Sequence, residues 1–473
     1  MVLVFNVDLT KEQEEIVNFE GNELLIKGIA GSGKTTVLLK KARKIIESKE
    51  GVTVALFTFN RTLANYASEL AMFLNSDRIK IYTFHQWASK VLTEMGLKRP
   101  VISNKTAESL LEQAISNMKK KSNHRYFNDN KYFTFLREEI SWIKGKGLME
   151  FEDYQKVERI GRGSQVRVTK KDRKQIFELF EEYQKLLDVN GKMEFDDFAV
   201  KIYRNIDSFP ESMRIDYILI DEAQDLDQMQ LLVLRNAARK GIVIAADKGQ
   251  KIYKTSFSWS DIGINVRGGR TKELKNSFRS TKQIISLAYS LQKQDSLYKS
   301  KDEDFVSPEI PKHEGPLPIV VKSKDKYTHD RTVINFIREW REKDPDSIIG
   351  ILARLWRPLY RLKYALDREK ISFEMIQREE GKVTTPGVKL TTFHSAKGLE
   401  FDVVFVIDLN SDVVPLPFEE DEVEDETEYM DIERRLLYVS MTRAKHMLYM
   451  FYYGEPSPFL LEADPELYEE IEV

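Results

Sequence analysis

Short apolar runs alternate with helical stretches in two separate regions of the chain. In the first region the apolar runs lie at 23–27, 52–57, 79–82, 217–220 and 241–245, and helical patterns lie at 35–48, 62–74 and 227–238. Short runs rich in Val, Ile and Leu are typical of parallel strands that are buried on both faces. This alternation predicts an α/β layer with a mainly parallel sheet.

A second region repeats the pattern nearer the C-terminus. Its strand-like runs lie at 317–321, 347–352, 371–376, 388–392 and 403–407, and its helical patterns at 331–342, 358–368 and 432–442. The residues between about 89 and 190 are polar, lysine-rich and helical in pattern, which predicts a helical insertion in the first α/β domain. We expect the glycine-containing stretch 256–270 to connect the two domains.

The composition excludes several classes of protein. The chain has 473 residues, of which 42% are hydrophobic and 32% charged, which is typical of globular domains. It lacks cysteine, which excludes disulfides, thiolate zinc sites and cysteine-bound iron–sulfur clusters. It has no apolar run near the ~18 residues that span a bilayer, and residues 1–8 show no secretory signal. We therefore expect a cytoplasmic protein.

Charge by itself does not identify a partner. The net charge of −3 gives no indication of nucleic acid, because local patches decide such binding. Two basic clusters stand out, at 119–125 and at 159–174, and a solvated helix face is as good an explanation of either as a binding surface. The acidic run 419–428 is interpreted as a surface loop.

A phosphate-binding loop follows the first apolar run. Residues 28–35 read Gly-Ile-Ala-Gly-Ser-Gly-Lys-Thr, which matches G-x-x-x-x-G-K-[ST] and leads into the helical stretch 35–48. The glycines let backbone N–H groups turn toward the phosphates, and the positive end of the helix faces the anion. We expect Lys34 to reach the β- and γ-phosphates and the Thr35 hydroxyl to hold Mg²⁺.

An acidic motif follows another apolar run. Asp221-Glu222-Ala-Gln-Asp225 comes directly after 217–220, where the end of a buried strand can meet a nucleotide on a neighbouring loop. We predict that Asp221 holds Mg²⁺ and that Glu222 orients and activates the attacking water. A polar helix cap is the alternative for the motif alone, but its pairing with a phosphate loop favours the nucleotide site.

These motifs, in this order, resemble those of superfamily 1 helicases of the UvrD/Rep/PcrA type, from Leu9 to about Tyr453. The resemblance implies an α/β fold of two RecA-like P-loop domains, with ATP and Mg²⁺ as cofactors. We assign 1–88 and 191–268 to the ATP-binding domain 1A, 89–190 to the helical insertion 1B, and 269–473 to domain 2A. Only about 115 residues separate Arg279 from His394, which leaves no room for the family's helical 2B domain.

The resemblance also implies roles around the nucleotide. Gln13, in Leu-Thr-Lys-Glu-Gln, would read adenine; Phe278, in Leu-Lys-Asn-Ser-Phe-Arg-Ser, would stack on it. Gln250 and the two arginines, Arg279 and Arg443, would contact the γ-phosphate. The expected catalytic residues are Lys34, Asp221, Glu222, Gln250, Arg279 and Arg443, with Thr35 and Asp221 at the metal. The expected nucleotide-binding residues are Gln13, Gly28, Ala30, Gly31, Ser32, Gly33, Lys34, Thr35, Thr36, Phe278, Gly398 and Glu400.

Further motif matches imply contacts to single-stranded nucleic acid. Aromatic and hydroxyl side chains on loops at strand ends suit such a strand, because bases stack on rings whatever their sequence. The expected contacts are Thr58, Asn60, Arg61, Phe84, His85, Tyr253, Thr392 and His394. Core packing is an equally good explanation of Phe57, Phe59 and Trp87, whereas Phe84 and His85 are better candidates because they end a strand.

The chain departs from the family pattern at a few positions. Thr36 replaces the usual arginine after the phosphate loop, and Tyr253 is not followed by the usual stacking tryptophan, although Trp259 lies nearby. These changes do not touch the residues of ATP hydrolysis, but they concern the details of stepping along a strand.

Three functions remain open at this stage. The leading hypothesis is an ATP-dependent translocase on single-stranded or tailed duplex DNA that acts as a 3′→5′ helicase, with the polarity taken from the resemblance. The first alternative is a DNA-stimulated ATPase that drives a partner, such as a nuclease in repair or anti-phage defence, without unwinding alone. The second is a non-enzymatic DNA-binding scaffold. RNA is not excluded as the substrate, because nothing identifies a 2′-hydroxyl reader.

Overall fold

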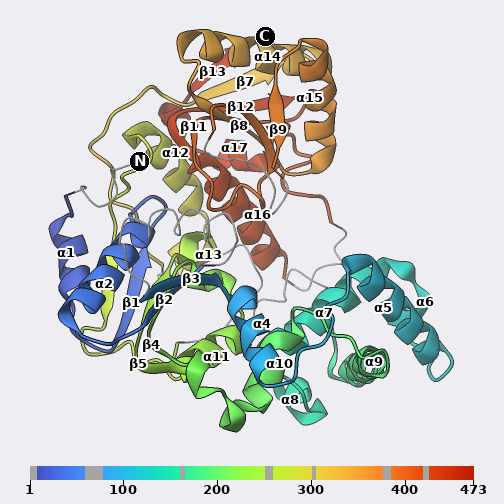
Figure 1. Cartoon of the computed structure of the whole chain (residues 1–473). Helices are drawn as coiled ribbons and strands as arrows, with labels where there is room; N and C mark the ends of the chain where they lie inside the picture. Colours follow the sequence, from blue (N-terminus) through green and yellow to red (C-terminus); the bar gives the residue numbers. More distant parts are fainter. Residues whose placement is uncertain are drawn as a thin grey trace.

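The computed structural model describes residues 8–58, 78–159, 166–250, 259–300, 305–376, 385–418 and 425–473. Two parallel sheets, each covered by helices, lie in separate domains beside a group of helices (Figure 1). The predicted α/β fold with a helical insertion is therefore confirmed. The expected helix at 62–74 and the candidate residues Asn60, Arg61 and Tyr253 lie outside the described residues.

None of the described helices is long and apolar enough to cross a membrane.

The first sheet has the strand order β3-β2-β4-β5-β1-β6. Its strands are β1 (Glu23–Gly28), β2 (Val54–Thr58), β3 (Ile79–Thr83), β4 (Ile215–Ile220), β5 (Ala238–Ala246) and β6 (Thr271–Leu274). One face packs against α1 (Lys11–Asn18) and α2 (Lys34–Ser48), and the other against α4 (Phe84–Glu94), α10 (Asp197–Arg204) and α11 (Gln228–Ala237). Phe57 and Trp87 meet in the second of these cores, with ring centroids 5.5 Å apart, so the core-packing interpretation of both is confirmed.

The second sheet has the strand order β13-β7-β12-β11-β8-β10-β9. Its strands are β7 (Ile319–Ser323), β8 (Ile348–Ala353), β9 (Phe373–Met375), β10 (Gly387–Thr392), β11 (Phe401–Val406), β12 (Ala444–Tyr453) and β13 (Glu469–Glu472). One face carries α14 (Lys326–Lys343) and α15 (Trp356–Arg368), and the other α12 (Lys282–Gln292), α16 (Glu426–Met441) and α17 (Pro458–Glu462); the short α13 (Ser296–Lys299) packs against α16. The described residues between Arg279 and His394 thus belong to this domain, and the absence of a 2B domain stays a prediction.

Two predicted domain boundaries shift. Strand β6 pairs with β1 in the first sheet, from Leu25↔Thr271 to Gly28↔Leu274, so the chain crosses to the second domain after Leu274 and not within 256–270. The sequence hid this strand because Thr-Lys-Glu-Leu is a short, polar edge strand without an apolar run. Helix α4 packs in the first core, so the insertion begins after α4 and not at residue 89.

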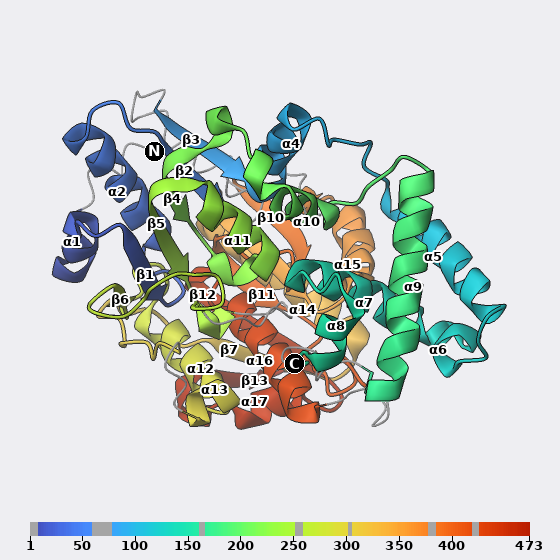
Figure 2. The ribbon, with the colours of Figure 1, turned by 90° about the horizontal axis from the view of Figure 1, so that it is seen from below.

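The insertion forms a helical unit with its own core. Its helices are α5 (Asn104–Lys119), α6 (Arg125–Asn128), α7 (Phe133–Lys146), α8 (Phe151–Lys156) and α9 (Lys170–Val189). Figures 1 and 2 both show these helices projecting to one side of the first domain. Two arginines of the basic cluster 159–174 make contacts inside this helical unit. Arg159 pairs with the buried Glu139, and Arg173 donates to three carbonyls at the end of α8. Neither arginine lies on a solvated face.

A buried ion cluster fastens the insertion to the first domain. Lys144 on α7 is fully buried and lies 2.7 Å from Glu194 and 2.8 Å from Asp197, which begins α10. At the same contact Gly145 approaches the start of α11 so closely that a methyl group there would lie 3.1 Å from the Asp227 side chain. The insertion is therefore held against the helices that follow and precede β4.

We expect Lys144→Met to destabilise the protein strongly, since it leaves two carboxylates facing a buried apolar side chain. Breaking a buried pair in this way costs roughly 3–5 kcal/mol. Lys121→Met is the matched control, because Lys121 is exposed and its pair with Glu182 contributes at most about 1 kcal/mol. Thermal unfolding followed by circular dichroism measures both, and equal melting temperatures for the two variants would contradict the assignment.

Candidate nucleotide and nucleic-acid site

The phosphate loop joins the end of β1 to the start of α2. Gly31 and Gly33 adopt the left-handed backbone conformation, with φ of 71° and 81°. A side chain at Gly31 is also excluded by space, because its Cβ would lie 2.7 Å from Cβ of Arg279 and from Oγ of Ser277. The glycines thus shape a loop that touches the second domain, and the N-terminus of α2 opens toward it.

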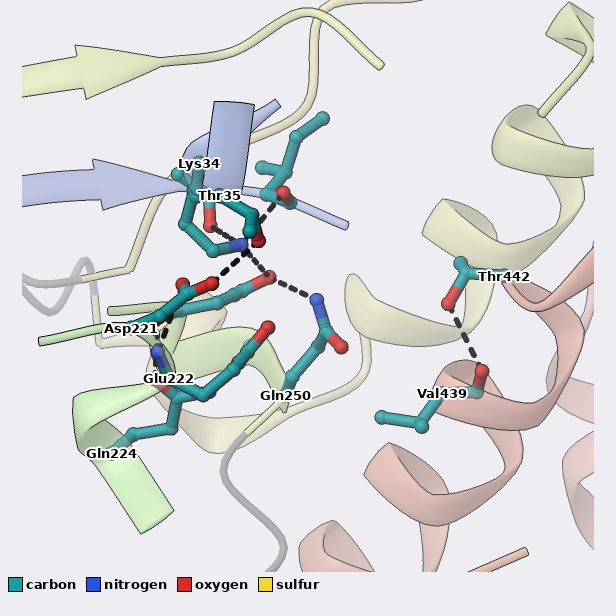
Figure 3. Close-up of polar contacts among 12 residues, drawn as sticks. Lys34, Thr35, Asp221, Glu222, Gln224, Gln250, Val439 and Thr442 are labelled. Atoms are coloured by element: carbon teal, nitrogen blue, oxygen red, sulfur yellow. Dashed lines mark hydrogen bonds and ion pairs between the residues drawn. The ribbon is translucent and has the colours of Figure 1, made fainter. Parts of the chain in front are cut away.

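Lys34 faces inward from the first turn of α2. Its Nζ donates to the carbonyls of Gly28 and Ile29, both at 3.0 Å, and lies 3.8 Å from Oδ2 of Asp247. This buried ammonium sits within the loop that would wrap a phosphate chain (Figure 3). A bound phosphate can take over these contacts, because an anion competes well with two neutral carbonyls.

Thr35 and Asp221 form the predicted metal pair. The Thr35 hydroxyl donates to Oδ2 of Asp221, which follows the last residue of β4 (Figure 3). A hydroxyl and a carboxylate in contact are ligands that suit Mg²⁺, which usually keeps several waters and also binds substrate phosphates. Burial, together with the neighbouring Glu222 charge, raises the pKa of Asp221 to about 6. A divalent cation would relieve this unfavourable charge.

Glu222 occupies a position suited to a general base. Its backbone is left-handed, with φ of 50°, and the Gln224 amide donates to its carboxylate. Burial alone would raise the Glu222 pKa, but Lys34 and Lys397 outweigh that effect and lower it. The carboxylate is therefore ionised and can take a proton from water.

The two predicted arginines come from the second domain. Arg279 pairs with Glu400 at 2.6 Å, and Arg443 donates to Oε1 of Gln250 at 3.0 Å. Burial, together with the nearby Arg279, lowers the pKa of Arg443 to about 9, so its guanidinium is still charged at neutral pH. Both cations therefore lie at the domain boundary facing the loop and the acidic motif, an arrangement that can stabilise negative charge on a phosphoryl group.

The other predicted nucleotide contacts surround this centre. Phe278 is 58% exposed, and its N–H donates to the Gly31 carbonyl at 2.9 Å, so its ring is open to a base. Gln13 is buried; its Nε2 donates to the Ser32 carbonyl at 3.1 Å and its Oε1 accepts from the Thr10 N–H. The remaining members stand on the loop, on the first turn of α2 or before β11, namely Ala30, Ser32, Thr36, Gly398 and Glu400.

Three charged residues of this site had no role in the sequence analysis. Lys397 donates to Oδ1 of Asp225 at 2.6 Å and to the Gln250 carbonyl at 2.7 Å, and Asp247 accepts from the Gln250 amide. Asp225 stands within the acidic motif read from the sequence. However, Lys397 and Asp225 are 172 positions apart, and no local pattern predicts that they meet.

The nucleic-acid candidates of the first domain need one correction. Phe84 is only 2% exposed and packs against Trp87, so its ring offers no free face and it is removed from the base-stacking candidates. It begins a helix, and the amphipathic face of α4 turns it into the core. His85 lies beside it, half-buried, with a buried Nε2 that makes no hydrogen bond to the described residues. Thr58, at the end of β2, has a buried hydroxyl that likewise makes no hydrogen bond to the described residues.

Phe195 is a candidate that the sequence analysis missed. Its ring is 53% exposed and lies 5.1 Å from the His85 ring in an edge contact. A large exposed aromatic beside an unsatisfied imidazole is a surface that a base can cover. Its sequence neighbourhood, Glu-Phe-Asp-Asp, gave no periodic or motif signal, and only its exposure singles it out.

The second domain contributes Thr392 and His394. Thr392 ends β10, and its buried hydroxyl donates to Oγ of Ser395 at 3.1 Å. His394 is half-buried in the segment that follows. Trp259, which was considered as a replacement for the missing tryptophan, packs against the first-domain core.

We expect Asp221→Asn to stabilise the protein free of nucleotide and metal, and to do so more at pH 8 than at pH 5. The folded-state pKa of Asp221, about 6, exceeds its ordinary value of 3.8, so its contribution to stability falls as pH rises through this window. Asn never ionises and can still accept from Thr35. Melting temperatures in EDTA at both pH values test this, and a gain independent of pH would contradict the buried-charge explanation.

Comparisons with known proteins give a consistent result. The model of the UvrD/REP helicase N-terminal domain matches residues 9–264, and that of the UvrD-like helicase C-terminal domain matches residues 377–455. A probable DNA helicase of Mycoplasma pneumoniae is 23% identical over 96% of this chain and 86% of its own. DNA helicase IV of Escherichia coli is 23% identical over 94% and 68%. ATP-dependent DNA helicase PcrA of Bacillus subtilis is 27% identical over 62% of this chain but only 40% of its own.

Proposed function

This chain belongs to the UvrD/REP helicase family, and on that premise we propose that it is an ATP- and Mg²⁺-dependent translocase on single-stranded DNA that acts as a 3′→5′ helicase. One observation carries the proposal. Lys34, the Thr35–Asp221 pair and Glu222 of the first domain face Arg443 and Arg279 of the second across one boundary. The polarity is taken from the family resemblance.

The residues divide the work of hydrolysis between the domains. Lys34 exchanges its two loop carbonyls for phosphate oxygens, and the ionised Glu222 takes the proton of the attacking water. Arg279 and Arg443 stabilise the charge that develops on the transferred phosphoryl group. Mg²⁺, held by Thr35 and Asp221, would neutralise phosphate charge and orient the triphosphate.

The positions of the arginines and of the nucleic-acid candidates couple ATP hydrolysis to movement along a DNA strand. Because the arginines belong to the second domain, their engagement with the γ-phosphate draws the two domains together, and loss of that phosphate releases them. His85 and Phe195 lie on the first domain and Thr392 and His394 on the second. A strand that contacts both sets would be advanced by each cycle of closing and opening.

The test is ATP hydrolysis titrated with single-stranded DNA, duplex DNA and single-stranded RNA, followed by unwinding of 3′- and 5′-tailed duplexes. We expect stimulation by single-stranded DNA and unwinding from the 3′ tail. Stimulation without unwinding would replace the helicase with an ATPase that drives a partner. An absence of hydrolysis with every nucleic acid would leave a DNA-binding scaffold.

A further inference from the structure

The turn that carries Gln250 belongs to the first domain but is held by the second. This 3₁₀ turn, η5 (Lys248–Gln250), follows β5. The Gln292 amide of α12 donates to the Gly249 carbonyl at 3.2 Å, and Lys397 donates to the next carbonyl, that of Gln250, at 2.7 Å. Arg443 donates to the Gln250 side chain at 3.0 Å. Three separate elements of the second domain therefore converge on two consecutive residues.

The contacts are buried and closely fitted. Gln292 is 3% exposed and Lys397 is 6% exposed, so water competes little for either hydrogen bond. Gly249 has no room for a side chain, because a Cβ there would lie 2.7 Å from Nε2 of Gln292. The Lys397 charge is balanced by the buried Asp225 of the acidic motif. The absence of a side chain at Gly249 thus makes room for the Gln292 amide from the other domain.

The position of the turn matters because Gln250 links the two halves of the site. Its side-chain amide nitrogen donates to Asp247, which lies 3.8 Å from Lys34. Its side-chain oxygen, Oε1, accepts from Arg443. A side chain that bridges the phosphate-loop lysine to an arginine of the other domain acts only if its backbone is correctly placed. Gln292 and Lys397 hold that backbone by the main-chain carbonyls of two consecutive residues, Gly249 and Gln250.

We propose that Gln292 and Lys397 are positioning residues that let the second domain set the place of Gln250, so that closing of the domains and engagement of the γ-phosphate occur as one step. This inference rests on the proposed ATP hydrolysis and adds two residues that do not touch the nucleotide. Gln292 acts through the Gly249 carbonyl alone, whereas Lys397 holds the Gln250 carbonyl and also helps to keep Glu222 ionised.

The first test is Gln292→Met, which keeps the length of the side chain but removes its donor. We expect kcat for DNA-stimulated ATP hydrolysis to fall about tenfold or more while KM for ATP changes little, because a misplaced catalytic group slows the reaction more than it weakens binding. Gln283→Met is the matched control on the same helix, since Gln283 accepts a hydrogen bond from the Gly315 N–H away from the turn. Equal kcat in the two variants would overturn the proposal.

A double-mutant cycle separates positioning from a general loss of stability. In the wild-type background Gly249→Ala should lower kcat, because its methyl group displaces the Gln292 amide. In a Gln292→Ala background that space is empty, so the same change should cost much less. Losses that simply multiply would show that the two positions act independently, contrary to the proposal.

Lys397 is tested with a second buried lysine as its control. Lys397→Met should lower stimulated kcat, whereas Lys389→Met, which removes the ion pair of a buried lysine with Glu374 inside the second domain, should affect only stability. Lys397→Met leaves the Asp225 carboxylate without its cation in a buried place, where burial already raises its pKa to about 7. The double variant Lys397→Met/Asp225→Asn removes both charges of the pair. We expect this double variant to regain melting temperature without regaining kcat, and full recovery of kcat would overturn the role of Lys397.

Different results contradict the proposed function and the positioning roles. A wild-type protein without nucleic-acid-stimulated hydrolysis contradicts the proposed function. A wild-type protein that is active, with Gln292→Met and Lys397→Met equally active, contradicts only the positioning roles.

Discussion

Glu222→Gln stops ATP turnover and leaves ATP binding intact. The carboxylate is half-buried yet ionised, because Lys34 and Lys397 outweigh the effect of burial on its pKa. Glutamine has the same size and can still accept the hydrogen bond that Gln224 donates to Glu222. It cannot accept a proton from water, and loss of a general base costs about 10²–10⁴ in rate.

The measurement pairs steady-state hydrolysis with equilibrium binding of a fluorescent ATP analogue, both in the presence of single-stranded DNA. A variant at Glu426, an exposed acid at the start of α16 away from the phosphate loop, serves as the control for loss of one negative charge. Turnover of Glu222→Gln within a few-fold of wild type would remove Glu222 from the catalytic role.

Arg443→Gln has the second large effect, on the chemical step and on communication between the domains. Arg443 brings a charged guanidinium into a buried position against Gln250. An arginine that stabilises a transferred phosphoryl group contributes ~10³–10⁵ in kcat. We expect a loss in that range, with ATP binding reduced much less because the phosphate loop and Phe278 remain.

Arg434→Gln is the matched control, because Arg434 lies on α16, which ends two residues before Arg443. Arg434 is also buried, but it pairs with Asp431 and Glu462 within the second domain. Its loss should lower the melting temperature and leave kcat near wild type at a temperature where the protein is folded. If Arg434→Gln and Arg443→Gln reduce kcat equally, the effect of Arg443 is on folding and not on catalysis.

Much of the fold follows from local patterns. The strands at 23–28, 54–58, 79–83 and 215–220 were recognised as apolar runs, since a strand buried on both faces has no polar alternation. The sequence analysis did not predict β6, β12 or β13; β12 is apolar and largely buried, whereas the other two are less apolar. β6 is short and polar, and β13 reads Glu-Glu-Ile-Glu, so each becomes a strand only by pairing with a neighbour.

The nucleotide site was predictable to a similar degree. The phosphate loop and the Asp221–Glu222 motif depend on contiguous residues, so their chemistry is visible in the sequence. The aromatic candidates were not predictable, because the motif match favoured Phe84 and nothing in the sequence favoured Phe195, whereas packing buries the first and exposes the second. The basic cluster 159–174 divides in the same way, because Lys170, Lys171 and Lys174 are exposed on α9, whereas Arg159 and Arg173 make buried contacts inside the insertion.

Local order along the chain was sufficient for the glycine loop, the acidic motif and the two α/β layers, because each depends on neighbouring residues. The pairing of distant groups required the tertiary structure. Lys397 with Asp225, Gln292 with Gly249 and Arg443 with Gln250 each join the two domains. Such contacts arise from the packing of one domain against the other, which no short stretch of sequence encodes.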